Sequence, residues 1–161
     1  MNSESEICFA AESTLGKLAK WLRILGFDTF YKPGVSAEKF IDIKFKNRIL
    51  LTRTERLRDG RLSKQLIFVT SNNPFEQLRE VINTLDIVYE DTRPFSRCIR
   101  CNTRIEHVDK DSVHGKVPDF IWGTHDTFQA CSQCRRIYWP GSHMERSHDL
   151  IMKLFDRYDK I

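Results

Sequence analysis

The sequence contains no long hydrophobic run and no targeting segment at its start. No stretch approaches the roughly 20 consecutive apolar residues that a membrane-spanning helix needs. Residues 1–6, Met-Asn-Ser-Glu-Ser-Glu, carry neither the basic nor the apolar part of a secretory signal. We therefore expect a cytoplasmic protein without a membrane partner, whose cysteines stay reduced.

The sequence also lacks a strong excess of charge of either sign. Its 26 basic and 22 acidic residues give a net charge of +4, which is compatible with an anionic partner but does not by itself indicate one. With 40% hydrophobic and 30% charged residues, the composition is that of a globular protein and excludes a disordered chain. A length of 161 residues suffices for one domain, or for one domain with a small module.

Cysteine is scarce, and four of the five cysteines fall in two Cys-x-x-Cys pairs. Cys98 and Cys101 form the first pair, and Cys131 and Cys134 form the second. Two pairs of this kind are typical of a structural site in which four thiolates bind one Zn²⁺ ion. A redox dithiol would need only one pair, and a disulfide framework would be unusual in a reduced compartment. Cys8 lies in an apolar run and is expected to be an inert buried thiol.

The first half of the chain alternates between short apolar runs and amphipathic segments. The predicted strands are residues 7–11, 28–31, 48–52 and 66–70. The helices are expected to begin at a Ser13 or Thr14 cap and close at Gly26, to run from a Ser36 cap to Asn47, and to begin at Asn73-Pro74. Continuous apolar strands that alternate with helices indicate an α/β fold with a parallel sheet flanked by helices.

Charged residues follow the predicted strands, at the edge where parallel sheets carry their functional sites. Glu12, Glu38 and Glu55 are three carboxylates that could together hold Mg²⁺ or Mn²⁺ for hydrolysis of a phosphodiester. A local excess of positive charge that would suit a phosphate backbone comprises Arg53, Arg56, Arg58, Arg61 and Lys64. The alternative is that these are ordinary loop residues, because such glutamates often occur by chance.

Basic and aromatic residues surround the cysteine pairs. The candidates for contact with single-stranded RNA are Arg100 and Arg136, through its phosphates, and Trp139, through base stacking. The alternative is that Tyr138 and Trp139 only cover a small core.

Four histidines are rival ligands in this part of the chain. Because four cysteines complete a zinc site, His107, His114 and His125 are expected to be surface or linker residues. For His143, packing, a nucleic-acid contact and a metal role stay open.

Arg93-Pro94 is a plausible linker. It divides the chain into an α/β domain over residues 1–93, a ribbon over 94–146 and a C-terminal helix over 147–161. One apolar face of that helix is predicted to comprise Leu150, Ile151, Leu154, Phe155 and Tyr158.

Several motifs, taken together and in this order, resemble the Mut-seven C-terminal RNase family. They are residues 9–29, Arg48-Ile-Leu-Leu-Thr-Arg53, Gln77-Leu-Arg79, residues 95–102, and Cys131 through Tyr138-Trp139 to His143. The resemblance runs from about residue 7 to residue 146. It implies a PIN-like ribonuclease domain followed by a small zinc-ribbon module, with Glu12 and its neighbours at the catalytic site and RNA as the substrate.

The acidic positions depart from the family pattern. Glu12 stands where the family usually has aspartate, and the start of the second helix carries only Glu38. Thr54 stands where the family usually has the aspartate of a Thr-Arg-Asp motif, with Glu55 one residue later. Because fewer carboxylates bind a hard cation less tightly, three functions stay open. They are a metal-dependent ribonuclease, a degenerate relative that binds RNA or a protein without cutting, and a zinc module fused to an inert domain.

Overall fold

The computed structural model describes residues 6–43, 45, 47–58 and 65–156. The chain divides into two compact units, Met1–Arg93 and Pro94–Ile161. Among the described residues, no helix has both the length and the apolar character needed to cross a membrane. Arg61, Lys64 and Tyr158, which the sequence analysis singled out, lie outside the described residues.

The first unit is built on a four-stranded parallel sheet, which confirms the predicted α/β fold. The strands are β1 (Cys8–Ala11), β2 (Asp28–Tyr31), β3 (Ile49–Thr52) and β4 (Leu66–Phe68). Their order is β2-β1-β3-β4, so that β1 and β3 are the central strands. Phe9, Ala10, Leu50 and Leu51 are buried, because helices cover both faces of the sheet.

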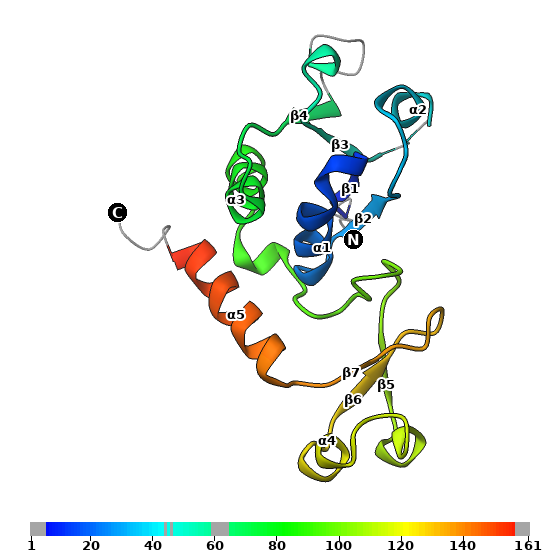
Figure 1. The fold of residues 1–161 in the computed structure, drawn as a ribbon. Coiled ribbons are helices and arrows are strands. Elements are labelled where there is room, and N and C mark those ends of the chain that lie inside the picture. Colours follow the sequence, from blue (N-terminus) through cyan, green and yellow to red (C-terminus); the bar gives the residue numbers. More distant parts are fainter. Residues whose placement is uncertain (1–5, 44, 46, 59–64, 157–161) are drawn as a thin grey trace, which may run out of the picture. The chain divides into compact units, whose positions relative to one another are not determined.

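Three helices cover this sheet. They are α1 (Gly16–Ile24), α2 (Ala37–Asp42) and α3 (Pro74–Thr84). Phe40 of α2 packs with Ala10 and Leu50 in one buried cluster. Helix α1 packs against β2 and against α3, and Figure 1 shows α1 and α3 on the side of the sheet away from α2. In parallel sheets functional sites lie at the carboxyl ends of the strands, and here Glu12 follows β1 and Thr52 ends β3 at that edge.

The start of α3 agrees with its prediction. The side-chain oxygen of Asn73 accepts hydrogen bonds from the backbone N–H groups of Phe75, at 3.0 Å, and Glu76, at 3.1 Å. Pro74 occupies the first helical position, where its missing N–H group costs nothing.

Two other helix boundaries were predicted wrongly. A 3₁₀ turn, Ser13–Leu15, precedes α1, and the Thr14 hydroxyl donates to the Glu12 carboxylate and does not cap the helix. Helix α2 ends at Asp42, because the backbone of Ile43 is already extended. Phe45, which lies beyond the end of the helix, still packs against the cluster around Phe40. The spacing of apolar residues from Phe40 to Phe45 therefore indicated burial and not a continuing helix.

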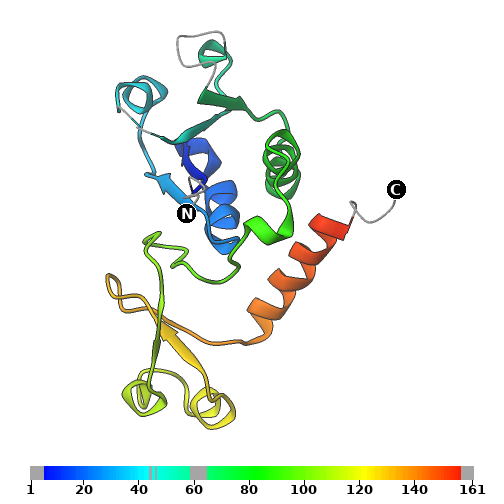
Figure 2. The same cartoon turned by 180° about the vertical axis from the view of Figure 1, so that it is seen from behind.

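The second unit contains a three-stranded antiparallel sheet in the order β5-β6-β7. Its strands are β5 (Glu106–Val108), β6 (Phe128–Ala130) and β7 (Ile137–Tyr138). A 3₁₀ turn, Lys110–Val113, and helix α4 (Asp119–Thr124) connect β5 to β6. Figures 1 and 2 show both at the same end of the strands, where Val113, Val117 and Phe128 form a small core.

The unit ends in helix α5 (Ser142–Phe155). The helix begins before the boundary predicted at residue 147. β7 ends at Tyr138, and only Trp139, Pro140 and Gly141 separate it from Ser142, the first residue of the helix. Ile151, Leu154 and Phe155 of the predicted apolar face are buried, whereas Leu150 is 38% exposed.

Gly26 ends α1 as predicted and is held by close packing. Its φ is 93°, and the N–H groups of Gly26 and Phe27 bond to the carbonyl oxygens of Arg23 and Leu22, at 3.0 Å each. This is the hydrogen-bond pattern of a Schellman motif. A Cβ atom at position 26 would lie 2.3 Å from the Arg93 carbonyl oxygen, closer than any real contact.

We predict that Gly26→Ala lowers the free energy of unfolding by about 2–4 kcal/mol, the sum of left-handed backbone strain and the clash. Gly34→Ala is the matched control, since Gly34 also has a positive φ, of 76°, but has no atom within 4 Å of its added Cβ. Gly34→Ala should lower the free energy of unfolding by the backbone strain alone, about 1–2 kcal/mol. Urea unfolding measures both values, and an equal loss of unfolding free energy in the two variants would contradict the clash with the Arg93 carbonyl.

Candidate functional site

The four paired cysteines come together in the second unit. One sulfur atom from each of Cys98, Cys101, Cys131 and Cys134 lies within 4.8 Å of the other three, and Cys98 and Cys134 Sγ are 3.6 Å apart. Four sulfurs around a Zn²⁺ ion at about 2.3 Å would be about 3.8 Å apart, so the cluster fits one tetrahedral ion. Cys98 and Cys131 are buried, and Cys101 and Cys134 are partly exposed.

Two equivalent turns hold these cysteines. In the first, Asn102 N–H donates to the Cys98 carbonyl at 2.8 Å, and Cys101 N–H points at Cys98 Sγ at 3.4 Å. In the second, Arg135 N–H donates to the Cys131 carbonyl at 2.9 Å, and Cys134 N–H points at Cys131 Sγ at 3.5 Å. The residues that close the turns, Asn102 and Arg135, both have a positive φ, of 65° and 62°. Arg135 adopts this left-handed conformation although its side chain makes it unfavourable by roughly 1–2 kcal/mol.

Side chains outside the turns also contact the sulfurs. The Tyr138 hydroxyl donates to Cys98 Sγ at 3.1 Å and accepts from the Ile99 N–H at 3.3 Å. The Thr103 hydroxyl lies 3.1 Å from Cys131 Sγ. Such contacts orient ligand sulfurs and spread their negative charge. The hydroxyl of Tyr138 therefore belongs to the cysteine cluster, a role that the sequence analysis did not assign.

The cysteine pKa values differ because the sulfurs have different neighbours. Burial tends to raise the pKa of Cys131, but hydrogen bonds from the Cys134 N–H and from Thr103 outweigh it and lower that pKa to about 6. Burial and a hydrogen bond with Cys134 raise the pKa of Cys101 to about 12, and the charge of Cys98 adds to the shift. Zinc binding must therefore release protons, and zinc affinity must fall as the pH falls.

The edge of the parallel sheet is organised around Glu12. This residue follows β1 and is only 3% exposed. Its Oε1 accepts from the Thr14 hydroxyl at 2.8 Å and the Arg53 N–H at 2.7 Å. Its Oε2 accepts from the hydroxyls of Thr52, at 2.8 Å, and Thr54, at 3.0 Å. Each carboxylate oxygen thus has two protein donors, and the carboxylate joins the end of β1 to the loop after β3.

A second carboxylate at this edge was missed from the sequence. Glu80, in α3, accepts from the N–H groups of Thr70, at 2.8 Å, and Ser71, at 2.7 Å, and from the Thr70 hydroxyl at 3.0 Å. It binds the chain that follows β4, as Glu12 binds the chain that follows β3. Both carboxylates are therefore engaged in holding loops.

The other two predicted catalytic carboxylates are exposed and lie beside arginines. Glu38 forms an ion pair with Arg56, and Glu55 lies 3.9 Å from Arg58. Within the described part of the chain, the only group of three or more His, Cys, Asp or Glu side chains close enough to share a metal ion is the four-cysteine cluster. Glu12, Glu38 and Glu55 do not belong to such a group in the described part of the chain, and their role as ligands of Mg²⁺ or Mn²⁺ stays a prediction.

The predicted RNA-contacting arginines of the first unit differ in their surroundings. Arg53 is partly buried, and its guanidinium donates to the Thr70 carbonyl at 3.4 Å. Arg58 lies over the Phe68 ring, 5.0 Å from its centroid. Arg56 and Arg58 are well exposed, so their outer nitrogens reach solvent at the sheet edge.

In the second unit, Arg100 and Arg136 are exposed, one inside the first cysteine turn and one directly after the second. Trp139 is partly buried and packs against the core of Val113, Val117 and Phe128. Trp139 therefore covers the small core, as one of the two alternatives predicted, and its contact with RNA stays a prediction. His107, His114, His125 and His143 lie outside the cysteine cluster.

These features define an α/β domain with a parallel sheet, joined to a four-cysteine ribbon of the kind that binds structural zinc. The model of the Mut7-C RNAse domain family matches residues 7–151, nearly the whole chain. The chain belongs to this family, as its motifs indicated. Searches among curated proteins and among solved structures found no match.

We predict one zinc ion per chain in protein purified without chelators, with loss of zinc as the pH falls. Cys131→Ser should abolish zinc binding and the amide protection of the second unit, because the ion holds its two turns together. Cys8→Ser, a cysteine of β1, is the control and should keep the zinc. Metal analysis that finds far less than one zinc in the unaltered chain would contradict the ribbon.

We predict that Glu12→Gln destabilises the chain by about 1–3 kcal/mol, because an amide cannot accept all four hydrogen bonds and leaves buried donors unpaired. Glu38→Gln is the matched control and should change the free energy of unfolding by under about 0.5 kcal/mol, since its carboxylate is exposed. A carboxylate kept for metal binding would behave in the opposite way, because its neutralisation often stabilises a metal-free protein. Urea unfolding of the zinc-loaded variants separates the two cases.

Proposed function

We propose that this chain is an RNA-binding member of the ribonuclease family that does not hydrolyse RNA at the edge of its parallel sheet. One observation carries the proposal: both oxygens of the Glu12 carboxylate are occupied by protein donors. The family match over residues 7–151 supports RNA as the ligand. The predicted cytoplasmic location stays a prediction.

The exposed arginines support phosphate contact. Arg56 and Arg58 lie near the sheet edge, and Arg100 and Arg136 lie at the two cysteine turns. Arginine binds phosphate oxygens with two parallel hydrogen bonds, and a set of such contacts binds a nucleic-acid backbone without regard to sequence. With all four positions filled by cysteine, zinc would have no open position for substrate. Its role in this proposal is to fix the turns that present Arg100 and Arg136.

A metal-dependent ribonuclease is the second candidate. The family match and the position of Glu12 after the central strand β1 favour it. It requires Glu12 to exchange protein donors for Mg²⁺ or Mn²⁺, and Glu38 and Glu55 to leave their arginines. The hydrogen bonds of Glu12 make this rearrangement costly, because each buried donor left unpaired costs about 1–3 kcal/mol.

We predict that the zinc-loaded chain binds single-stranded RNA with an affinity that falls steeply with salt, measured by fluorescence anisotropy. Replacing both Arg100 and Arg136 by Gln should weaken binding roughly five- to tenfold through lost phosphate contacts. Replacing Lys17 and Lys20, two exposed lysines of the first unit, by Gln removes the same charge and should have a smaller effect.

The same preparations, incubated with Mg²⁺ or Mn²⁺, should leave the RNA intact on a denaturing gel. Cleavage by the unaltered chain that Glu12→Gln abolishes, below the unfolding temperature of the variant, would overturn the proposal in favour of the second candidate. Failure to bind RNA at any salt concentration would contradict both.

A further inference from the structure

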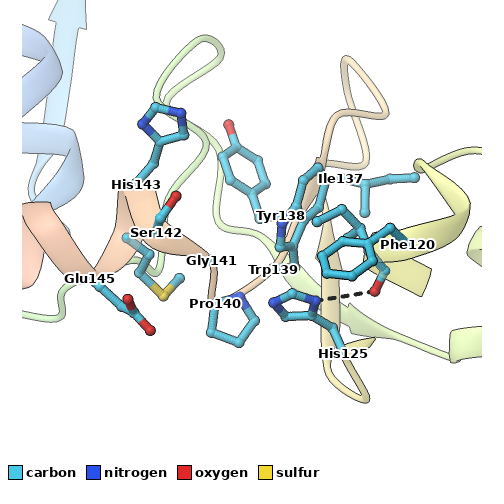
Figure 3. Close-up of a pocket in the computed structure, with 12 residues that line it drawn as sticks. Phe120, His125, Ile137, Tyr138, Trp139, Pro140, Gly141, Ser142, His143 and Glu145 are labelled. Carbon is cyan, nitrogen blue, oxygen red and sulfur yellow. Dashed lines mark hydrogen bonds between the residues drawn. The ribbon is translucent and has the colours of Figure 1, made fainter. Parts of the chain in front are cut away.

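A pocket of about 510 Å³ opens on the second unit, and of the residues named so far as RNA contacts only Trp139 is among those that line it. It is formed by α4, by β7 and by the start of α5. Figure 3 shows the rings of Phe120, His125 and Trp139 on one side, and Ser142, His143 and Glu145 on the other. Its volume falls within the roughly 300–1,000 Å³ of sites that hold small molecules or single nucleotides.

Phe120 is the distinctive residue of this pocket. It is 75% exposed, the largest exposure among the large hydrophobic residues that the structure describes as exposed. Its neighbours in sequence Ile121 and Trp122 pack on the small core, so α4 is held without help from Phe120. The ring therefore contributes little to folding and offers a flat apolar face beside Trp139 and His125.

Polar groups surround this aromatic surface. His125 Nδ1 lies 3.1 Å from the Ile121 carbonyl and 3.0 Å from the Thr124 hydroxyl, so this nitrogen bonds within the protein and Nε2 is the ring nitrogen that could bond to a ligand. Ser142 can donate or accept, and Glu145 can accept from an exocyclic amino group or a ribose hydroxyl. Among the described residues that line the pocket there is a carboxylate, Glu145, and no lysine or arginine, which disfavours a phosphate inside the pocket.

Two arginines directly precede the pocket residues of β7 in the chain. Arg135 and Arg136 are exposed, and the next two residues, Ile137 and Tyr138, line the pocket. A pocket with aromatic and hydrogen-bonding groups inside, and with arginines next to it in the sequence, suits one unpaired nucleotide, whose base is flat and polar at its edges and whose phosphates are anionic.

We propose that this pocket binds an unpaired base of single-stranded RNA, stacked against Phe120, with the adjoining phosphates at Arg135 and Arg136. The inference rests on the proposed RNA binding and assigns a base-binding position to it. Because every base has a flat face, stacking adds affinity for single strands without requiring a particular sequence.

The test compares Phe120→Ala with the unaltered, zinc-loaded chain on three RNA probes of equal length. The probes are a single strand, the same strand with abasic sites, and the duplex. We expect Phe120→Ala to weaken binding of the single strand roughly five- to tenfold, the effect of one lost stacking contact. It should leave the affinities for the abasic strand and the duplex unchanged, because neither offers a free base.

Tyr89→Ala is the matched control, since Tyr89 is an exposed aromatic residue of the first unit, and it should bind all three probes normally. Zinc content and thermal unfolding of Phe120→Ala should match those of the unaltered chain. Equal loss on the duplex, or no loss on the single strand, would overturn the base pocket while leaving the proposed RNA binding in place. An unaltered chain that binds no RNA, or a pocket that takes up a peptide and no RNA, would overturn the inference together with RNA binding at this site.

Discussion

The hydrogen bonds of the Glu12 carboxylate determine what the sheet edge can do. A carboxylate ligand must direct an oxygen lone pair at its cation, and here each oxygen faces two donors from the protein. Three of these donors are hydroxyls, and the fourth, the Arg53 N–H, is fixed by the backbone. The Thr52 hydroxyl also accepts from the Thr54 N–H at 3.0 Å, so the loop after β3 depends on the same group. A carboxylate in such surroundings stabilises the fold, and its removal leaves buried donors unpaired.

The second unit depends on a separate interaction, the convergence of four sulfurs. The strands of its sheet are only two or three residues long, and the cluster beside them contains three buried residues, Val113, Val117 and Phe128, so a bound ion would add much of the constraint. The two turns fix the backbone positions of Arg100 and Arg136. Tyr138 of β7 contacts Cys98 through its hydroxyl and also lines the pocket. In the proposed function, zinc would therefore influence RNA contact only through the backbone, and the two would share no side chain.

The strands and the grouping of the four cysteines could be predicted from the sequence because both depend on local patterns. Buried parallel strands require continuous apolar runs, and Cys-x-x-Cys pairs require a fixed spacing. The position of Glu12 directly after β1, at the edge where parallel sheets carry functional sites, was also predicted correctly. Its hydrogen bonds could not be predicted, because Thr52 and Thr54 lie some forty residues away and only the folded sheet brings them to Glu12. Glu80 was missed because it lies within a helix, where a glutamate gives no signal. Pro118-Asp119 could have indicated α4, and with it the exposed Phe120.

The central proposal is that Glu12 acts as a structural group and not as a metal ligand. Nuclear magnetic resonance of the zinc-loaded chain titrated with Mn²⁺ tests it most directly, because a bound paramagnetic ion broadens nearby amide signals. The account predicts that the amides of Thr14, Arg53 and Thr54 broaden no more than those of other exposed loops. Saturable broadening centred on these three amides, with loss of the effect in Glu12→Gln, would contradict it.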